Sequence, residues 1–232
     1  MINLSISRIN RLHLVNAAIC LFASILSFTS IAKADTPAFR LRLNNIQQDY
    51  TKEDIEVEIE FGRNLAARIL STYKLIDDQA IQTYVNLLGN GIAAQLGRPE
   101  LQYYFGVLDT NDINAYACPG GYIFITKGAL KSMENEAQLA GVIAHEIGHV
   151  NNRHVVKPLR IRAKGDTVTS GVAAAIGGGT AAARVFLNQL TEKAFSLLFE
   201  EGVSQEFELE ADTSAIEGLI NLGYDWRSYK HY

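Results

Sequence analysis

The sequence predicts an α+β fold that is mainly helical, with a small antiparallel sheet directly before a helix that carries a His-Glu-x-x-His motif. Residues 53–74 and 77–96 have the apolar periodicity of helices, whereas residues 101–126 are rich in β-forming and turn residues. Helical periodicity then returns around His145-Glu-Ile-Gly-His149. A chain of 232 residues is long enough to bury one sizeable core around these elements.

The first two helices are predicted from apolar spacing and from signals at their ends. The helix over 53–74 has mostly acidic residues at its start and basic residues later, which suits the helix dipole. Asp77 and Asp78 precede the second helix, which runs to about Leu96, and Pro99 lies just beyond its end.

Three short strands are predicted between residues 101 and 126. The first is Leu101–Leu108, the second is Asn114–Cys118, and the third is Tyr122–Thr126, which follows a Pro119-Gly-Gly121 turn. Because the strands follow one another closely, we expect them to pair as a small antiparallel sheet beside the motif helix.

The motif helix is predicted to begin at Asn135. Asn135 and Gln138 have the three-residue spacing of a capping box. Apolar residues then follow one stripe with a helical period, at Leu139, Val142, Ile143, Ile147 and Val150. The motif therefore lies on a helix that is anchored by a buried face.

The motif contains the residue types that zinc-dependent peptide hydrolysis needs. On a helix, His145 and His149 lie on one face and can bind one metal ion together. Glu146 is turned about 100° from His145, so its carboxylate can reach a water held on that metal and act as its base. The same pattern also arises by chance in ordinary helices, so it needs support from elsewhere in the chain.

A third ligand is expected, because catalytic zinc sites usually have three protein ligands and an open position for water. Glu208 and Asp212 lie on one helix face, where Glu208 would complete the ligand set and Asp212 would orient a ligand histidine. Glu206 and Glu210 share another helix face but are not flanked by apolar residues in the same way. The alternative is that these acids only form a solvated helix start.

His154 is not expected to bind the metal itself; we expect it either to contact the ligands from outside the metal site or to lie at the surface. The metzincin extension of the motif is excluded, since it requires Gly and His where Asn152 and Val155 stand. The basic run over 153–164 is interpreted as a solvated face. The helix is expected to extend as far as His154 and to end or kink at Pro158.

The N-terminus has the pattern of a secretory signal peptide. Two arginines precede an uncharged apolar run over 14–32, and Ala32-Lys-Ala34 provides the small residues that a signal peptidase recognises before its cleavage site. We therefore expect a signal peptide over 1–34, cut before Asp35, and export to the periplasm or out of the cell. The alternative is an uncleaved membrane anchor, since the run approaches spanning length.

Charge and cysteine content narrow the function classes for residues 35–232. Removal of the signal peptide leaves 18 basic and 25 acidic residues, a net charge of −7, so no nucleic-acid partner is expected. Cys118 is then the one remaining cysteine, which excludes an intrachain disulfide. Cys118 is not expected to be a nucleophile, because no histidine lies near it in the sequence and its neighbours resemble a buried strand and turn.

The chain resembles the zinc peptidase family that includes the CAAX prenyl protease, the HtpX-type heat-shock protease and the BepA-type periplasmic proteases. It is most similar to the exported, BepA-like branch, and the resemblance covers nearly all of residues 50–226. Four runs carry it: Glu58-Ile-Glu-Phe-Gly-Arg63, Asn114-Ala-Tyr-Ala-Cys-Pro-Gly-Gly-Tyr-Ile-Phe-Ile-Thr126, His145-Glu-Ile-Gly-His-Val-Asn-Asn-Arg-His154 and Glu208-Leu-Glu-Ala-Asp212. The resemblance implies a zincin fold of the gluzincin type and a zinc metalloendopeptidase.

The roles of the family's site residues carry over to matching positions. One zinc ion per chain would be held by His145, His149 and Glu208, with Glu146 as the general base and Asp212 orienting a ligand histidine. The substrate cleft would be bordered by the strand of Asn114, Ala115, Tyr116 and Ala117, which could pair with an extended peptide. By analogy, the substrates would be unfolded or misassembled envelope proteins.

The chain departs from the family pattern at two places. Thr213 stands where the family commonly has arginine, and the chain ends at Tyr232, where the family domain usually continues. The basic or histidine side chain that steadies the transition state in the family is not identified, although His231 is a candidate. The domain over 35–232 could thus be C-terminally incomplete, and the tetratricopeptide repeats of the BepA-like branch are absent.

Two other functions stay open at this point. A zinc-binding chaperone-like or latent protein with little turnover would need the metal but not Glu146. A zinc hydrolase that acts on other substrates is disfavoured, because an edge strand suits an extended peptide. Residues 167–187, rich in Gly, Ala, Thr and Val, could form a lid or approach a membrane, and the oligomeric state is left open.

Overall fold

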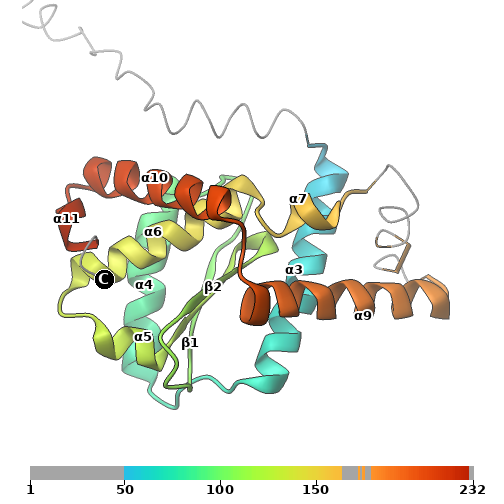
Figure 1. The fold of residues 1–232 in the computed structure, drawn as a ribbon, viewed down its shortest axis with the longest axis horizontal. Coiled ribbons are helices and arrows are strands. Elements are labelled where there is room, and N and C mark those ends of the chain that lie inside the picture. Colours follow the sequence, from blue (N-terminus) through green and yellow to red (C-terminus); the bar gives the residue numbers. More distant parts are fainter. Residues whose placement is uncertain (1–49, 164–171, 173, 176–178, 230–232) are drawn as a thin grey trace, which may run out of the picture. The chain divides into compact units, whose positions relative to one another are not determined.

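The computed structural model describes residues 50–163, 172, 174–175 and 179–229 (Figure 1). The predicted signal peptide, part of the 167–187 segment and His231 lie outside these residues. Within them, the N-terminal helices are α3 (Lys52–Thr72) and α4 (Gln79–Leu96), close to the predicted ranges. Asp78 caps α4, because its side chain accepts hydrogen bonds from two backbone N–H groups of the first turn.

The sheet has three strands, β1 (Tyr104–Leu108), β2 (Ala115–Cys118) and β3 (Tyr122–Thr126), in the order β1-β3-β2. The mainly helical fold with a small sheet beside the motif helix is confirmed. The all-antiparallel pairing is corrected: β2 and β3 are antiparallel, but β1 runs parallel to β3. The tight turn after β2 joins β2 and β3 as an antiparallel hairpin. Strand β3 lies in the middle of the sheet, between β2 and β1, so β2 is an edge strand.

The turn between β2 and β3 is shaped by glycine. Gly120 has φ 73°, a conformation that L side chains rarely adopt. Helix α3 packs directly on this turn, since a Cβ at Gly62 would lie 1.8 Å from the carbonyl oxygen of Pro119. The close approach of α3 supports the end of the edge strand.

The motif helix is α6 (Glu136–Asn152), and it lies at the centre of the fold (Figure 1). Its predicted N-cap is confirmed, because the Asn135 side chain accepts a hydrogen bond of 3.1 Å from the backbone N–H of Gln138. The Gln138 side chain turns instead to the backbone N–H of Glu134, at 2.6 Å, so the capping box is not reciprocal. The helix ends before Pro158 is reached, because Arg153 adopts a left-handed conformation with φ 57°.

The C-terminal part of the described chain is helical. Its elements are α9 (Ala181–Ser196), the π-helical turn η2 (Leu197–Glu201), α10 (Gln205–Leu222) and α11 (Trp226–Tyr229). Helix α9 packs on α3. Two further short helices are α5 (Lys127–Ser132) and α7 (Val156–Leu159). Helices α10 and α11 pack along α6, which also contacts α4 and β2.

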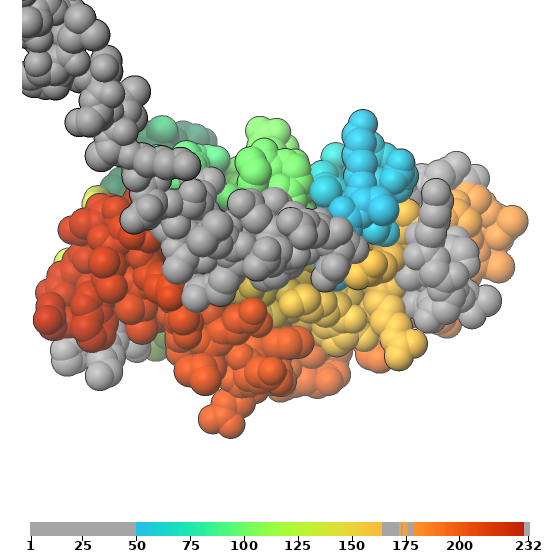
Figure 2. All heavy atoms as spheres, turned by 90° about the horizontal axis from the view of Figure 1, so that it is seen from above, coloured from blue at the N-terminus to red at the C-terminus, as the bar shows by residue number. Residues whose placement is uncertain are grey.

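Small residues permit the close packing of α10 on α6. A Cβ at Gly148 would lie 3.2 Å from the backbone of Ala211, so the two helices meet within the motif itself. Figure 2 shows the segment after α6 (yellow) reaching the surface between α3 (blue) and the start of α10 (orange-red). Within the described part of the chain, no helix combines the length and hydropathy that spanning a membrane requires.

Candidate metal centre

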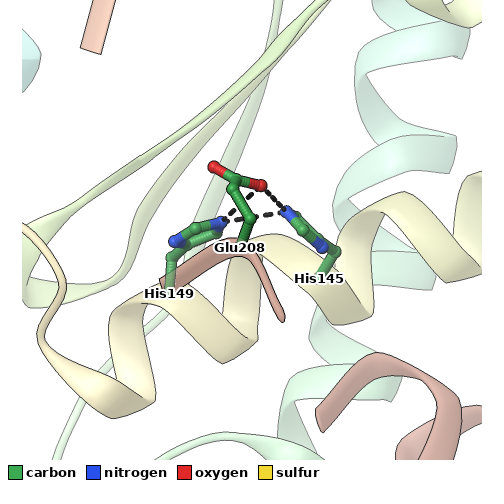
Figure 3. A group of neighbouring side chains, drawn as sticks. All are labelled: His145, His149 and Glu208. Atoms are coloured by element: carbon green, nitrogen blue, oxygen red, sulfur yellow. Dashed lines mark hydrogen bonds and ion pairs between the residues drawn. The ribbon is translucent and has the colours of Figure 1, made fainter. Parts of the chain in front are cut away.

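The side chains of His145, His149 and Glu208 meet between α6 and α10 (Figure 3). The Nε2 atoms of the two histidines lie 2.9 Å apart. One carboxylate oxygen of Glu208 lies 3.3 Å from Nε2 of His145 and 3.8 Å from Nε2 of His149. Two residues one helical turn apart and a third from a distant helix therefore present three ligand atoms to one point.

The donor set fits a zinc ion. Tetrahedral zinc with bonds of about 2.0–2.1 Å places its ligand atoms roughly 3.3 Å apart, and the three separations lie on either side of this value. The Nδ1 atom of His145 lies 2.9 Å from Oδ1 of Asp212, so it carries the proton and leaves a lone pair on Nε2. A lone pair and a carboxylate oxygen directed at one point repel each other unless a proton or a metal ion lies between them.

The two ligand histidines differ in their proton affinity. Burial and the neighbouring rings of His145 and His154 lower the pKa of His149 to about 2, so His149 is neutral at working pH. Burial alone would lower the pKa of His145, but the hydrogen bond with Glu208 and nearby carboxylates outweigh burial and raise it. An anionic surrounding that attracts a proton to His145 also attracts a metal cation.

Glu146 lies on α6 between the two histidines and is buried. Its pKa is raised to about 7, because burial penalises the charged carboxylate, while His145 lowers the pKa and Glu208 raises it. A carboxylate with a pKa near neutrality can both accept and return a proton.

A cleft crosses the candidate metal position. One hollow is lined by Asn114 to Ala117, the two motif histidines, Glu146 and apolar residues that include Val155, Leu197 and Leu198. A second hollow is lined by Asn114, Ala115, His145, Glu146, Glu208 and Tyr229, among others. Because five residues line both hollows, the cleft extends to either side of the histidines, with the edge strand β2 along one wall.

The structure places Asp212 behind His145, and it adds a neighbour that the sequence did not indicate. The hydroxyl of Tyr229 donates a hydrogen bond of 2.8 Å to Oδ1 of Asp212 and lies 2.9 Å from Nδ1 of His145. Tyr229 is in a four-residue helix near the end of the chain, where no periodicity marks it as a site residue.

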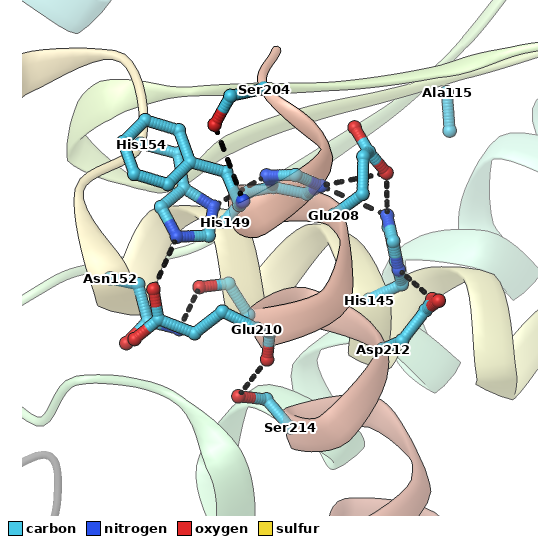
Figure 4. A network of polar contacts seen from close by, with 12 residues as sticks. Ala115, His145, His149, Asn152, His154, Ser204, Glu208, Glu210, Asp212 and Ser214 are labelled. Atoms are coloured by element: carbon cyan, nitrogen blue, oxygen red, sulfur yellow. Dashed lines mark hydrogen bonds and ion pairs between the residues drawn. The ribbon is translucent and has the colours of Figure 1, made fainter. Parts of the chain in front are cut away.

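His154 and Glu210 are also close to the ligands (Figure 4). His154 is fully buried, with its Nδ1 at 2.8 Å from Nδ1 of His149 and its Nε2 at 3.1 Å from Oε2 of Glu210. The interpretation of 153–164 as a solvated face is therefore wrong at its start, since Arg153 is buried too and donates to Glu58 at 3.0 Å. The left-handed turn at Arg153 folds the chain back under α6, which no sequence pattern predicted.

Cys118 lies in β2, buried and free of any disulfide. Burial raises the pKa of its thiol, and the negative charge of Glu146 adds to this effect. The thiol therefore stays protonated, in agreement with the expectation that Cys118 is not a nucleophile.

A buried helix with two histidines and a glutamate, a carboxylate from a second helix and a cleft along an edge strand define a zinc metallopeptidase. The chain belongs to the Peptidase family M48, whose family model matches residues 79–231. The resemblance drawn from the sequence motifs is thereby confirmed.

Several characterised proteins are similar to the chain. The beta-barrel assembly-enhancing protease of Escherichia coli (strain K12) is 25% identical over 173 residues, which cover 72% of this chain and 35% of that protein. Metalloprotease LoiP of the same organism is 32% identical over 147 residues, 62% of this chain and 52% of LoiP. The mitochondrial metalloendopeptidase OMA1 of Schizosaccharomyces pombe is 32% identical over 120 residues, 50% of this chain and 33% of OMA1. The aligned part thus spans about a third of the length of the first of these relatives.

Proposed function

We propose that the chain is an exported zinc-dependent endopeptidase that cleaves unfolded or misassembled envelope proteins, with Glu146 as its general base. The observation that carries this proposal is the position of Glu146. It directly follows the first of two histidines that converge with Glu208, its side chain is buried, and it lines both hollows of the cleft.

Each site residue has a defined task in this proposal. His145, His149 and Glu208 would hold one zinc ion per chain, and Asp212 would hold the ring of His145 in place. A zinc ion held there would supply a Lewis acid that lowers the pKa of a coordinated water and polarises the scissile carbonyl. Glu146 accepts the proton of the attacking water and passes it to the leaving amine, for which a pKa near neutrality is suited.

The edge strand supports a polypeptide as the substrate. Strand β2 borders the cleft, and among the described residues no strand pairs with its outer edge. An extended peptide can add to such an edge through main-chain hydrogen bonds, which do not depend on its sequence. The relative named as a beta-barrel assembly-enhancing protease supports an envelope substrate, and the predicted signal peptide over 1–34 supports export.

Cleavage of casein by the purified, zinc-loaded protein tests the proposal, with Glu146→Gln beside it. We expect cleavage by the wild type and a loss of several orders of magnitude in Glu146→Gln, because the base is removed while the metal ligands stay. Glu134→Gln, at an exposed glutamate outside the cleft, is the matched control and should cleave as the wild type does.

The outcome also separates the alternative function. A protein that binds one zinc ion but does not cleave would be a latent or chaperone-like zinc protein. Cleavage that persists unchanged in Glu146→Gln would overturn the assignment of Glu146 as the base.

A further inference from the structure

The two ligand histidines are supported in different ways (Figure 4). The Nδ1 atom of His145 faces a carboxylate, that of Asp212, at 2.9 Å. The Nδ1 atom of His149 faces a second imidazole, that of His154, at 2.8 Å. His154 in turn reaches the carboxylate of Glu210 at 3.1 Å.

One arrangement of protons satisfies the whole chain of contacts. A ligand His149 offers the lone pair of Nε2 to the metal, so it carries its proton on Nδ1 and donates it to Nδ1 of His154. His154 therefore accepts at Nδ1, carries its own proton on Nε2 and donates it to Oε2 of Glu210. Glu210 thus selects the form of His154 that can accept from His149.

His154 is also held by packing. Its ring stacks on that of Phe207, with the ring centres 4.3 Å apart and the planes inclined by 3°. Its backbone N–H donates to the carbonyl oxygen of His149 at 3.2 Å, across the left-handed turn at Arg153. The position of the imidazole is therefore determined by the backbone on one side and by α10 on the other.

The contacts of His154 on α10 lie on either side of a metal ligand. Phe207 directly precedes Glu208, and Glu210 follows it by two residues. One buried side chain at the end of α6 thus touches the ligand His149 and also holds the first turns of the helix that supplies Glu208.

We propose that His154 is a positioning residue of the zinc site, which orients the ligand His149 by accepting its Nδ1–H and is itself oriented by Glu210. This inference rests on the proposed metal site. It adds a neutral support for one ligand, beside the anionic support that Asp212 offers to the other. Partners of this kind typically contribute about 10- to 100-fold to metal affinity.

Two substitutions separate the hydrogen bond from the packing. His154→Phe keeps an aromatic ring against Phe207 but removes the acceptor, so we expect zinc affinity to fall by about 10- to 100-fold. His154→Gln retains an acceptor for His149 and a donor for Glu210, so we expect most of the affinity to return. The dissociation constant of zinc is measured on the full chain by competition with a chelator, and urea unfolding of the zinc-free proteins reports their stability.

Either of two results would overturn the proposal. Zinc affinity unchanged in His154→Phe would show that the ring only fills space, and affinity equally low in both variants would show that the hydrogen bond has no part. If His154→Phe does not fold, the nitrogen shifts of the labelled wild-type imidazoles decide the matter. The proposal requires a neutral His154 with its proton on Nε2, and a proton on Nδ1 would refute it. Zinc binding needs no substrate, so a protein that binds zinc without cleaving would contradict the proposed function alone.

Discussion

The hydroxyl group of Tyr229 and the carboxylate of Asp212 lie 2.8 Å apart behind the first motif histidine. The same oxygen of Asp212 accepts from Nδ1 of His145 at 2.9 Å, so two donors converge on it. The ring of Tyr229 fits against Gly141 of α6, where a Cβ would lie 2.5 Å from the ring. The short helix α11 is thereby held against α6 one turn before the motif.

Tyr229→Phe should weaken zinc binding several-fold, because Asp212 loses one of the two donors that hold its orientation. The loss of one hydrogen bond should also cost about 1 kcal/mol of stability. Chelator competition and urea unfolding measure the two effects. Tyr224→Phe is the control, since its hydroxyl bonds to Glu136 at 2.9 Å and does not line the metal centre. Equal zinc affinity in the two variants would contradict a link between Tyr229 and the metal.

Glu146→Gln should stabilise the zinc-free protein at alkaline pH. The pKa of Glu146 is about 7 in the folded chain against an ordinary value of 4.5, so its ionised form costs stability above pH 7. That cost shrinks as the pH falls from 7 to 4.5, where Glu146 is protonated in the folded state. We therefore expect the variant to be more stable by ~3 kcal/mol at pH 8, since one pKa unit corresponds to about 1.4 kcal/mol.

Urea unfolding of both zinc-free proteins at pH 8 and pH 4 measures this difference, which should vanish at the lower pH. Glu134→Gln, which removes an exposed carboxylate outside the cleft, is the control. If the stability difference between Glu146→Gln and the wild type were the same at both pH values, it would come from a change in packing around the new amide and not from the ionisation of Glu146.

Ala115→Pro should impair substrate binding but leave the metal site intact. The N–H of Thr126 donates to the carbonyl oxygen of Asn114 at 3.0 Å, so the backbone polar groups of Asn114 point toward β3. In an antiparallel pair this direction alternates, so the backbone N–H and C=O of Ala115 point away from β3. In the free protein the N–H of Ala115 donates to Oδ1 of Asn114 at 2.8 Å, a local bond that a substrate carbonyl would replace. Proline at 115 removes this N–H, which should raise KM for a peptide by about 3- to 10-fold. Ala115→Ser retains the N–H and is the control. Equal KM values for both variants would argue against pairing of the substrate with β2.

The mature protein is expected to begin at Asp35. N-terminal sequencing and intact mass of protein recovered from the cell envelope test this boundary. Ala34→Leu replaces the small residue before the predicted cut and should leave the chain uncleaved. Recovery of the full 232-residue chain from the wild type would favour the membrane-anchor alternative.

The sequence by itself determined the elements that depend on local spacing. The motif helix and its N-cap at Asn135 follow from a helical period and a capping side chain, which are interactions within a few residues. The pairing of Glu208 with Asp212 likewise follows from a four-residue step on one helix. Local geometry of this kind is encoded in neighbouring residues, so it is readable before any fold is known.

Only the tertiary structure decided which distant residues meet at the ligands. Tyr229 and His145 are 84 positions apart, and His154 and Glu210 are 56 apart. The left-handed turn at Arg153 and the close contact of Gly148 with α10 bring these side chains together. The parallel pairing of β1 with β3 has the same origin, because strand order depends on how the core packs. Contacts between distant segments are selected by the free energy of burying the whole core, and no short stretch of sequence contains that information.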